Sequence, residues 1–326
     1  MKAARCVRGR AVALALAVVC AATPAAAQGQ DAAPTLRTFL VKYGFDDAIA
    51  AANAPDVDRP LSGWGVSIFN TTVAIAYYGK DPGSTPASNP LHVSRFDRAS
   101  ARWVHTEIND QRGGGIDSVT SGDQYIVVSV HINPSTSEGL VLDARTLNRV
   151  ASVLGYDFRA LDDGSIVFFG GMVHFAPIHK QTLRLFAMGK EVELFPGPQP
   201  SPVARAYRES FVKAADALSA AQRQVFAERN APPDDFDVSA SHLELREDHK
   251  RLAFTVSYDS DTLHDLPHPT MTTVVRCDRA APSKWPCREQ PVEDHAKSVG
   301  LTVSKRADGG YDDEALKAVI AATLKR

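Results

Sequence analysis

The sequence predicts a mainly β protein: a β-propeller-like body of about four blades, with an inserted long helix and helical segments towards both ends of the chain. Two observations predict this class. Four segments repeat the same order of short strands and tight turns. One of the gaps between them holds a proline-rich stretch, followed by apolar residues at helical spacing. Repeats of this kind are typical of proteins built from stacked structural units.

Each repeat is recognised by its second strand, which is strongly apolar and follows a tight turn. The expected second strands span 72–78, 125–130, 165–169 and 252–258. Turn residues such as Asp163-Gly164 tolerate the backbone conformations that a hairpin requires. The first two intervals lie near the 40–50 residues of a propeller blade, and the third is longer by about one helix. The pattern does not decide ring closure, so an open, curled sheet or a β-sandwich with helices stays an alternative.

The repeats divide the chain into six parts. We expect a signal peptide at 1–27, a lead-in with a short helix at 28–61, three β-blade repeats at 62–195, a proline-rich linker and long helix at 196–235, a fourth repeat with a disulfide at 236–292, and a C-terminal strand and helix at 293–326. Apolar residues recur at steps of three and four from Val203 to Val225, which predicts a helix of about 26 residues. The last part is expected to hold a strand at 300–304 and a helix from Asp312.

The first 27 residues have the layout of a secretory signal peptide. Four basic residues precede a short apolar core at 11–22 and a small-residue cleavage site, Ala25-Ala26-Ala27, which is the export pattern. This core is shorter than the about 20 residues that span a bilayer, and no later stretch is apolar enough to be transmembrane. We therefore expect a periplasmic or secreted protein. Removal of the peptide lowers the formal net charge from −2 to −6, which makes nucleic acid an improbable partner.

Cys277 and Cys287 are the two cysteines that remain after such a cleavage. Two lone cysteines outside the reducing cytosol usually form a disulfide. A redox-active pair is the alternative, but the spacing is not Cys-x-x-Cys. We therefore expect a structural bridge between these two residues.

Two stretches of the repeats resemble known exported proteins. GLVLDARTLNRV at 139–150 looks like a blade of bacterial exported β-propeller proteins. SIVFFGGMVHFAPIHKQTLRLF at 165–186 is similar to segments of exported bacterial proteins of uncharacterised function. The resemblance covers about half of the mature chain. It implies a propeller-like fold and no particular function, because those families include binders, scaffolds and lyases.

The long loops after the second strands are expected to leave the body on one face, and five of the ten histidines fall in them. Loops on a rigid sheet are where binding residues usually lie. The candidate ligand-binding residues in or beside these loops are His131, Asn133, His174, His179, Asp259, His264 and His268. His131, His174 and His179 are also candidate catalytic residues, since histidine is the usual acid–base group near neutral pH and binds transition metals. Ordinary solvated histidines are the alternative.

These patterns leave the specific function open. The favoured hypothesis is a non-enzymatic binding or interaction module of the cell envelope, which uses these loops to bind a small molecule, a glycan or an envelope protein. The alternative is a small propeller-type lyase or hydrolase that uses the loop histidines. No cofactor is expected, apart from a metal ion under the second hypothesis. A purely structural envelope protein is the third hypothesis.

Overall fold

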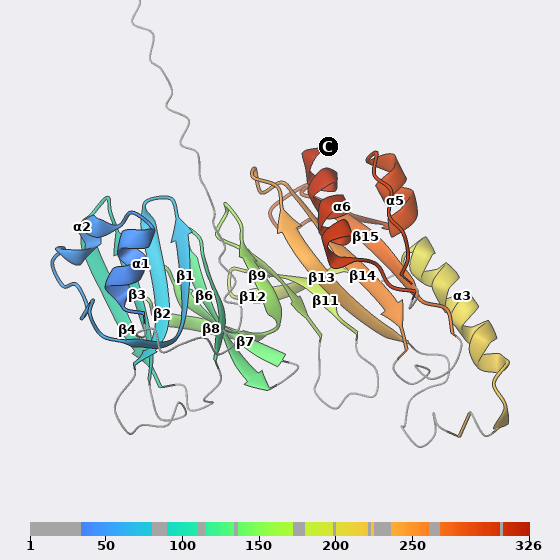
Figure 1. The fold of residues 1–326 in the computed structure, drawn as a ribbon, viewed down its shortest axis with the longest axis horizontal. Coiled ribbons are helices and arrows are strands. Elements are labelled where there is room, and N and C mark those ends of the chain that lie inside the picture. Colours follow the sequence, from blue (N-terminus) through green and yellow to red (C-terminus); the bar gives the residue numbers. More distant parts are fainter. Residues whose placement is uncertain are drawn as a thin grey trace, which may run out of the picture.

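The computed structural model describes residues 34–79, 90–109, 115–133, 136–171, 180–197, 200–220, 223–224, 236–260, 268–306 and 309–326. In this part of the chain, sixteen strands form four antiparallel sheets of four strands each. Helices lie before the first sheet, between the third and fourth sheets, and after the fourth (Figure 1). The prediction of a mainly β, propeller-like fold with four blades is therefore confirmed.

Every sheet is a meander in which consecutive strands pair. The first sheet holds β1 (Leu61–Phe69), β2 (Thr72–Gly79), β3 (Leu91–Asp97) and β4 (Arg102–Ile108). The second holds β5 (Ile116–Ser121), β6 (Tyr125–Asn133), β7 (Thr136–Asp143) and β8 (Arg149–Leu154). The third holds β9 (Tyr156–Ala160), β10 (Ile166–Gly170), β11 (Thr182–Ala187) and β12 (Lys190–Phe195). The fourth holds β13 (Asp237–Leu245), β14 (Arg251–Asp259), β15 (Met271–Asp278) and β16 (Cys287–Pro291). The helices are α1 (Leu36–Lys42), α2 (Asp46–Ile49), α3 (Pro202–Asp216), α5 (Val292–Ser298) and α6 (Asp313–Lys325).

The apolar second strands belong to two cores at once. In β10, Ile166 and Phe168 contribute to a core shared with the second sheet. Val167 and Phe169 contribute to a core shared with the fourth sheet. Successive side chains of a strand point to opposite faces, so a sheet that is covered on both faces requires apolar residues at every position. This explains the uninterrupted apolar runs that marked the repeats in the sequence.

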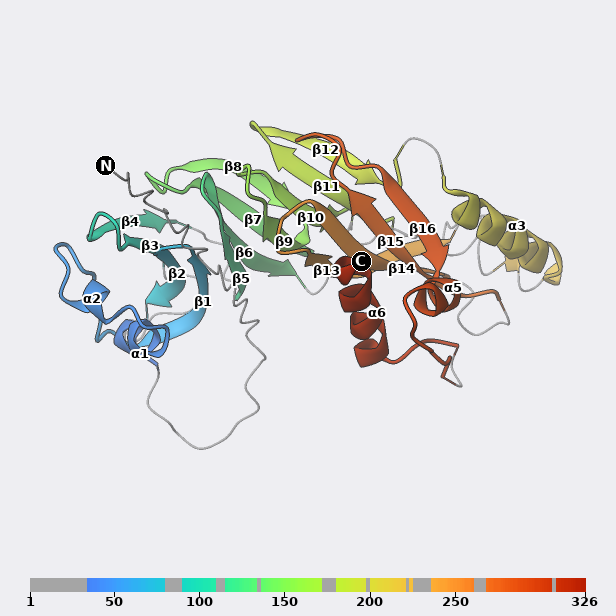
Figure 2. The ribbon, with the colours of Figure 1, turned by 90° about the horizontal axis from the view of Figure 1, so that it is seen from above.

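The four sheets form an open row in chain order, with the first and the fourth sheet towards opposite ends (Figures 1 and 2). The outward face of the first sheet is covered by α1 and α2. Leu36 and Phe39 of α1 and Ala48 of α2 share a core with Val73 and Ile75 of β2. This end of the row is therefore closed by helices instead of by another sheet.

The outward face of the fourth sheet is covered in the same way by α5 and α6. Val292 of α5 and Val319 and Ile320 of α6 share a core with Ala253 of β14 and Val274 of β15. A closed ring would need the first and fourth sheets to pack against each other, but helices occupy both faces. The molecule is thus an open row of blades with capped ends, as in repeat proteins whose terminal units shield the last core.

The middle helix differs from its prediction in length. α3 packs Tyr207 and Phe211 into the core between the third and fourth sheets, but it ends at Asp216 instead of continuing to a total of about 26 residues. The side chain of Arg223 donates to the carbonyls of Asp216 at 2.7 Å and of Leu218 at 3.1 Å. Carbonyls at a helix end have no partner inside the helix, so these bonds stabilise the end of α3 at Asp216. The spacing of apolar residues does not predict a helix end there.

The strand predicted at 300–304 is not formed. Gly300 has a φ of +79° and follows the end of α5. Leu301 and Val303 contact the core under α5 and α6, which satisfies their apolar side chains without a strand partner. No helix in the described ranges combines the length and the apolar character that a membrane-crossing segment needs.

Candidate functional site

The ends of the four second strands lie along one edge of the row. Tyr78 and Val130, near the ends of β2 and β6, share one core. Gly155 lies between the ends of β6 and β10. Its N–H donates to the carbonyl of Ser137 at 3.0 Å. A Cβ atom added to Gly155 would meet the carbonyl of Phe169, near the end of β10. The first three long connections therefore leave from the same edge.

The fourth connection leaves from this edge as well. Lys180, which precedes β11, forms a bridge with Val238 at the start of β13. Val238 pairs with Tyr258, near the end of β14. The loops themselves, including His174, His179 and His264, lie outside the described residues. Their proposed role in binding stays a prediction.

The described candidate residues at this edge are paired with carboxylates. The Nε2 atom of His268 lies 2.6 Å from Oδ1 of Asp259. The Nδ1 atom of His131 lies 3.6 Å from Oδ1 of Asp117. Asn133 is the last residue of β6, and its side chain lies outside the described part. The structure thus brings together Asp259 and His268 among the predicted residues. Within the described ranges, no three histidine, cysteine or acidic residues are grouped as metal ligands.

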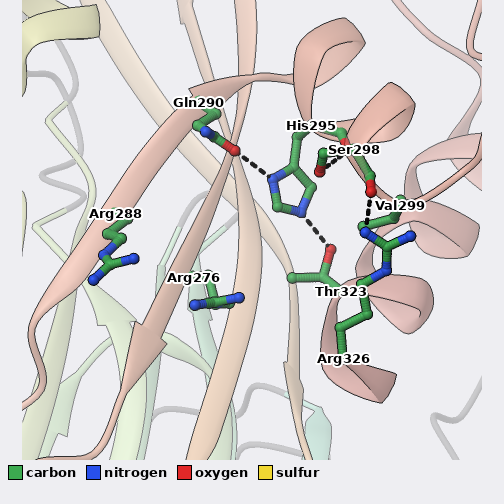
Figure 3. A pocket seen from close by; sticks show the side chains of 8 residues that line it. All are labelled: Arg276, Arg288, Gln290, His295, Ser298, Val299, Thr323 and Arg326. Atoms are coloured by element: carbon green, nitrogen blue, oxygen red, sulfur yellow. Dashed lines mark hydrogen bonds between the residues drawn. The ribbon is translucent and has the colours of Figure 1, made fainter.

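A pocket of about 240 Å³ lies away from this edge, between strands β15 and β16 of the fourth sheet and the C-terminal ends of α5 and α6. We call it the arginine pocket. It is lined by Arg276, Arg288, Gln290, His295, Ser298, Val299, Thr323 and Arg326. Figure 3 shows Arg276 and Arg288 on the strand side, Arg326 on the helix side and the ring of His295 between the two sides. The lining contains three guanidinium groups and no acidic side chain.

The register of the sheet brings the first two arginines together. Arg276 of β15 lies directly opposite Arg288 of β16. Arg276 forms an ion pair with Asp278, with 3.1 Å between NH2 and Oδ2, and Asp278 also binds Arg251. Burial acts to raise the pKa of Asp278, but the bonds and charges of these arginines outweigh it and hold the pKa below its ordinary value. The described part of the chain gives Arg288 no carboxylate partner.

The third arginine comes from the end of α6. Its NH1 group donates to the carbonyl of Ser298 at the end of α5. This contact fixes the guanidinium of Arg326 beside a helix C-terminus, where cations are favoured. The arginine pocket is therefore formed only when both helices lie on the sheet.

His295 forms the inner wall of the pocket and is 8% exposed. Its Nδ1 atom lies 2.9 Å from Oε1 of Gln290, and its Nε2 atom lies 2.8 Å from the hydroxyl of Thr323. Burial lowers the pKa of His295, and the charges of Arg276 and Arg326 lower it further. An amide oxygen only accepts hydrogen bonds, so Nδ1 of His295 donates to Gln290, and the hydroxyl of Thr323 also donates to the carbonyl of Val319 at 2.7 Å. The charges of the two arginines therefore add to the larger effect of burial on this pKa.

The predicted disulfide holds this site together. Cys277 and Cys287 are bonded, with 2.03 Å between the sulfurs, so that prediction is confirmed. They lie directly opposite each other on β15 and β16, one register position from Arg276 and Arg288. Sequence reasoning missed both arginines. The available signal was their position next to the cysteines, since a bridge between paired strands places the flanking residues opposite each other as well.

Comparisons with known proteins give only distant similarities. No protein-family model matches the chain, and no curated protein sequence is significantly similar to it. The β-propeller domain of the Trilobed protease from Pyrococcus furiosus is 9% identical, with a TM-score of 0.35, over 72% of this chain and 59% of that one. The GH93 α-L-arabinofuranosidase of Fusarium graminearum is 11% identical, with a TM-score of 0.31, over 67% of this chain and 62% of that one.

A third solved structure, HIRA(644–1017), is 8% identical, with a TM-score of 0.32, over 78% of this chain and 62% of that one. The chain thus spans less than two thirds of the length of each of these structures. Similarity at this level carries no argument about activity. The function has to be inferred from the residues of this chain.

Proposed function

We propose that the protein is an exported binding module that holds an anionic group of a ligand, such as a sulfate, phosphate or carboxylate, in the arginine pocket. The observation that carries this proposal is the lining, which has three arginines and no acidic side chain. A guanidinium presents a planar fork of donors that matches the oxygens of such anions. The disulfide and the contact of Arg326 with α5 hold these donors in place before a ligand arrives.

Export is part of the proposal. The N-terminal pattern that predicts it lies outside the described residues. The Cys277–Cys287 disulfide is the structural support, because such bonds persist mainly in proteins outside the reducing cytosol. A periplasmic or secreted location is consistent with both features.

The edge from which the long loops leave is a second proposed binding surface, for a small molecule, a glycan or an envelope protein. Two observations support this surface. The four second strands end at the same edge of the row, and His268 pairs with Asp259 there. A lyase or hydrolase based on His131, His174 and His179 is the alternative proposal for this edge. Metal analysis of the purified protein and a variant with all three histidines changed to alanine would test that alternative.

The test of the arginine pocket is calorimetric titration of the purified, disulfide-bonded protein with sodium sulfate. Ionic strength is held constant with sodium chloride, because salt screens exposed charges. We expect one binding site. A hydrogen bond to a charged group contributes about 1.5–3 kcal/mol, so Arg276→Ala and Arg288→Ala should each weaken binding by about tenfold or more.

Arg102→Ala is the matched control, because Arg102 is an exposed arginine on the first sheet. It should leave the affinity for sulfate unchanged. Citrate, titrated in the same way, distinguishes a site for carboxylates from one for sulfate-like anions. The proposal is wrong if neither anion binds, or if Arg288→Ala binds as tightly as the unchanged protein.

A further inference from the structure

A second polar cluster lies at the opposite end of α6 from the arginine pocket. Nε2 of His242 lies 2.7 Å from Oδ1 of Asp313, the first residue of α6. Nδ1 of the same ring lies 3.0 Å from the hydroxyl of Ser241 and 2.9 Å from that of Thr255. Ten residues of helix separate Asp313 from Thr323, which is about 15 Å. The cluster is therefore a separate place on the molecule.

A β-bulge in β13 produces this arrangement. The pairing of β13 with β14 shifts register between Ser241 and Glu244, and His242 has a φ of +58°. Neighbouring side chains of a regular strand point to opposite faces, so Ser241 and His242 could not otherwise meet. Bulges re-aim side chains in this way, and they are frequent next to active sites. A left-handed backbone at a residue other than glycine is strained.

The carboxylate of Asp313 sets the orientation and tautomer of the ring. A hydrogen bond from Lys317 and then one from His242 lower the pKa of Asp313, which is ionised near neutral pH. An ionised carboxylate only accepts hydrogen bonds, so Nε2 of His242 carries the proton. In the neutral ring, the lone pair of Nδ1 then faces the two hydroxyl groups. This is the relation of base and orienting carboxylate in Ser-His-Asp sites, with the roles of the two ring nitrogens exchanged.

The two hydroxyl groups differ in access. Thr255 is 1% exposed, and its hydroxyl lies 3.2 Å from the carbonyl of Ser241, to which it can donate. Ser241 is exposed. Of the two, Ser241 is the group that an external reagent can reach, and its hydroxyl lies within hydrogen-bond distance of Nδ1 of His242 and, at 2.9 Å, of the hydroxyl of Thr255.

We propose that Ser241 is an activated nucleophile that reacts with acyl compounds such as small esters, with His242 as general base and Asp313 as positioning residue. In the step, Oγ of Ser241 forms a bond to the carbonyl carbon, and its proton passes to Nδ1 of His242. The bond from that carbon to the alcohol oxygen breaks, and the alcohol leaves with the proton. Water then attacks the acyl-serine by the same route and releases the acid.

The test is acetylation by p-nitrophenyl acetate, followed by mass spectrometry of peptides from the intact protein. We expect the acetyl group on Ser241 to form at least ten times faster than on Ser210, an exposed serine of α3 whose hydroxyl, among the described residues, bonds to the carbonyl of Ala206 in its own helix. His242→Asn should remove this preference, since asparagine tolerates a positive φ. Asp313→Asn should reduce it by about tenfold or more.

Thermal unfolding of each variant shows whether it is folded. If both variants unfold, the comparison of Ser241 with Ser210 in the unchanged protein still decides the question. Equal rates at these two serines, or a preference for Ser241 that persists in a folded His242→Asn variant, would overturn the proposal. Acetylation of Thr255 in place of Ser241 would also overturn it.

Discussion

At the scale of single residues, the exposed Arg288 of β16 faces another arginine and has no carboxylate partner in the described part of the chain. It lies directly opposite Arg276 on the neighbouring strand, and like charges at opposite positions of an antiparallel pair destabilise it. Asp278 compensates the charge of Arg276, and Ser298 binds the guanidinium of Arg326. A bound anion would supply the compensation that Arg288 lacks within the described chain.

His295 gives the residue-scale prediction about pH. Burial and the charges of Arg276 and Arg326 lower its pKa from the ordinary value of 6.5. The unfolded chain therefore binds a proton on this ring at a higher pH than the folded chain does. We expect the free energy of unfolding to fall as the pH decreases from about 6.5 towards the folded pKa, and to fall less in His295→Gln. Urea unfolding at a series of pH values measures both curves.

The pKa of His295 is also expected to change when an anion binds. A bound anion favours the charged form of a nearby histidine, so sulfate should raise the pKa of His295, as followed by NMR of the ring protons. Parallel unfolding curves for the two proteins would show that burial and the two arginines do not shift this pKa. Binding of sulfate without any change in the titration of His295 would place the anion outside the arginine pocket.

The residues of this pocket could not be found from local sequence. Arg276 and Arg288 lie on the two paired strands of one hairpin and Arg326 lies at the end of α6, so hairpin register and helix packing bring the three together. Histidines in long loops were visible as a cluster of one residue type. Arginines on strands look like ordinary solvated positions, and the cysteines beside them were the one local sign of their pairing.

At the scale of elements, the hairpin of β15 and β16 connects stability to the proposed site. The disulfide closes a short loop between directly paired residues. A bridge of this kind stabilises mainly by restricting the unfolded chain, by about 2–3 kcal/mol for so short a loop. It also keeps Arg276 and Arg288 opposite each other against their mutual repulsion.

Replacement of both cysteines therefore has two expected results. The variant Cys277→Ala/Cys287→Ala should be less stable by about 2–3 kcal/mol, measured by urea unfolding. It should also bind sulfate more weakly under conditions where it is fully folded, because the arginine pair is free to separate. Unchanged sulfate affinity in the folded variant would mean that the register of the strands alone holds the arginines in place.

The sequence was most informative about elements with a strong local pattern. The second strands were predictable because both of their faces are buried, as the two cores of β10 show. The end of α3 and the segment at 300–304 were predicted wrongly. In both places, a side-chain contact outweighs the apolar pattern. Arg223 binds carbonyls a few residues before it at the end of α3, and Leu301 packs under α5 and α6 without a strand partner.

At the scale of the whole molecule, stability depends on close packing between successive sheets. Gly139 of β7 lies against Phe158 of β9, where an added Cβ would be 2.5 Å from the ring. We expect Gly139→Ala to lower the free energy of unfolding by about 1–3 kcal/mol, the usual cost of overpacking a core.

Gly115→Ala is the matched control, because a Cβ there meets no atom within 4 Å. Its free energy of unfolding should change by less than about 0.5 kcal/mol. Equal stability of the two variants in chemical unfolding would argue against tight packing between the second and third sheets.

The most direct test of anion binding surveys the whole surface in one experiment. Selenate is a tetrahedral dianion that resembles sulfate, and its selenium scatters X-rays anomalously. We predict that crystals of the disulfide-bonded protein soaked in selenate will show an anomalous peak between Arg276, Arg288 and Arg326. Selenate peaks at other arginines, with none in this pocket while it is free of lattice contacts, would contradict the proposed function.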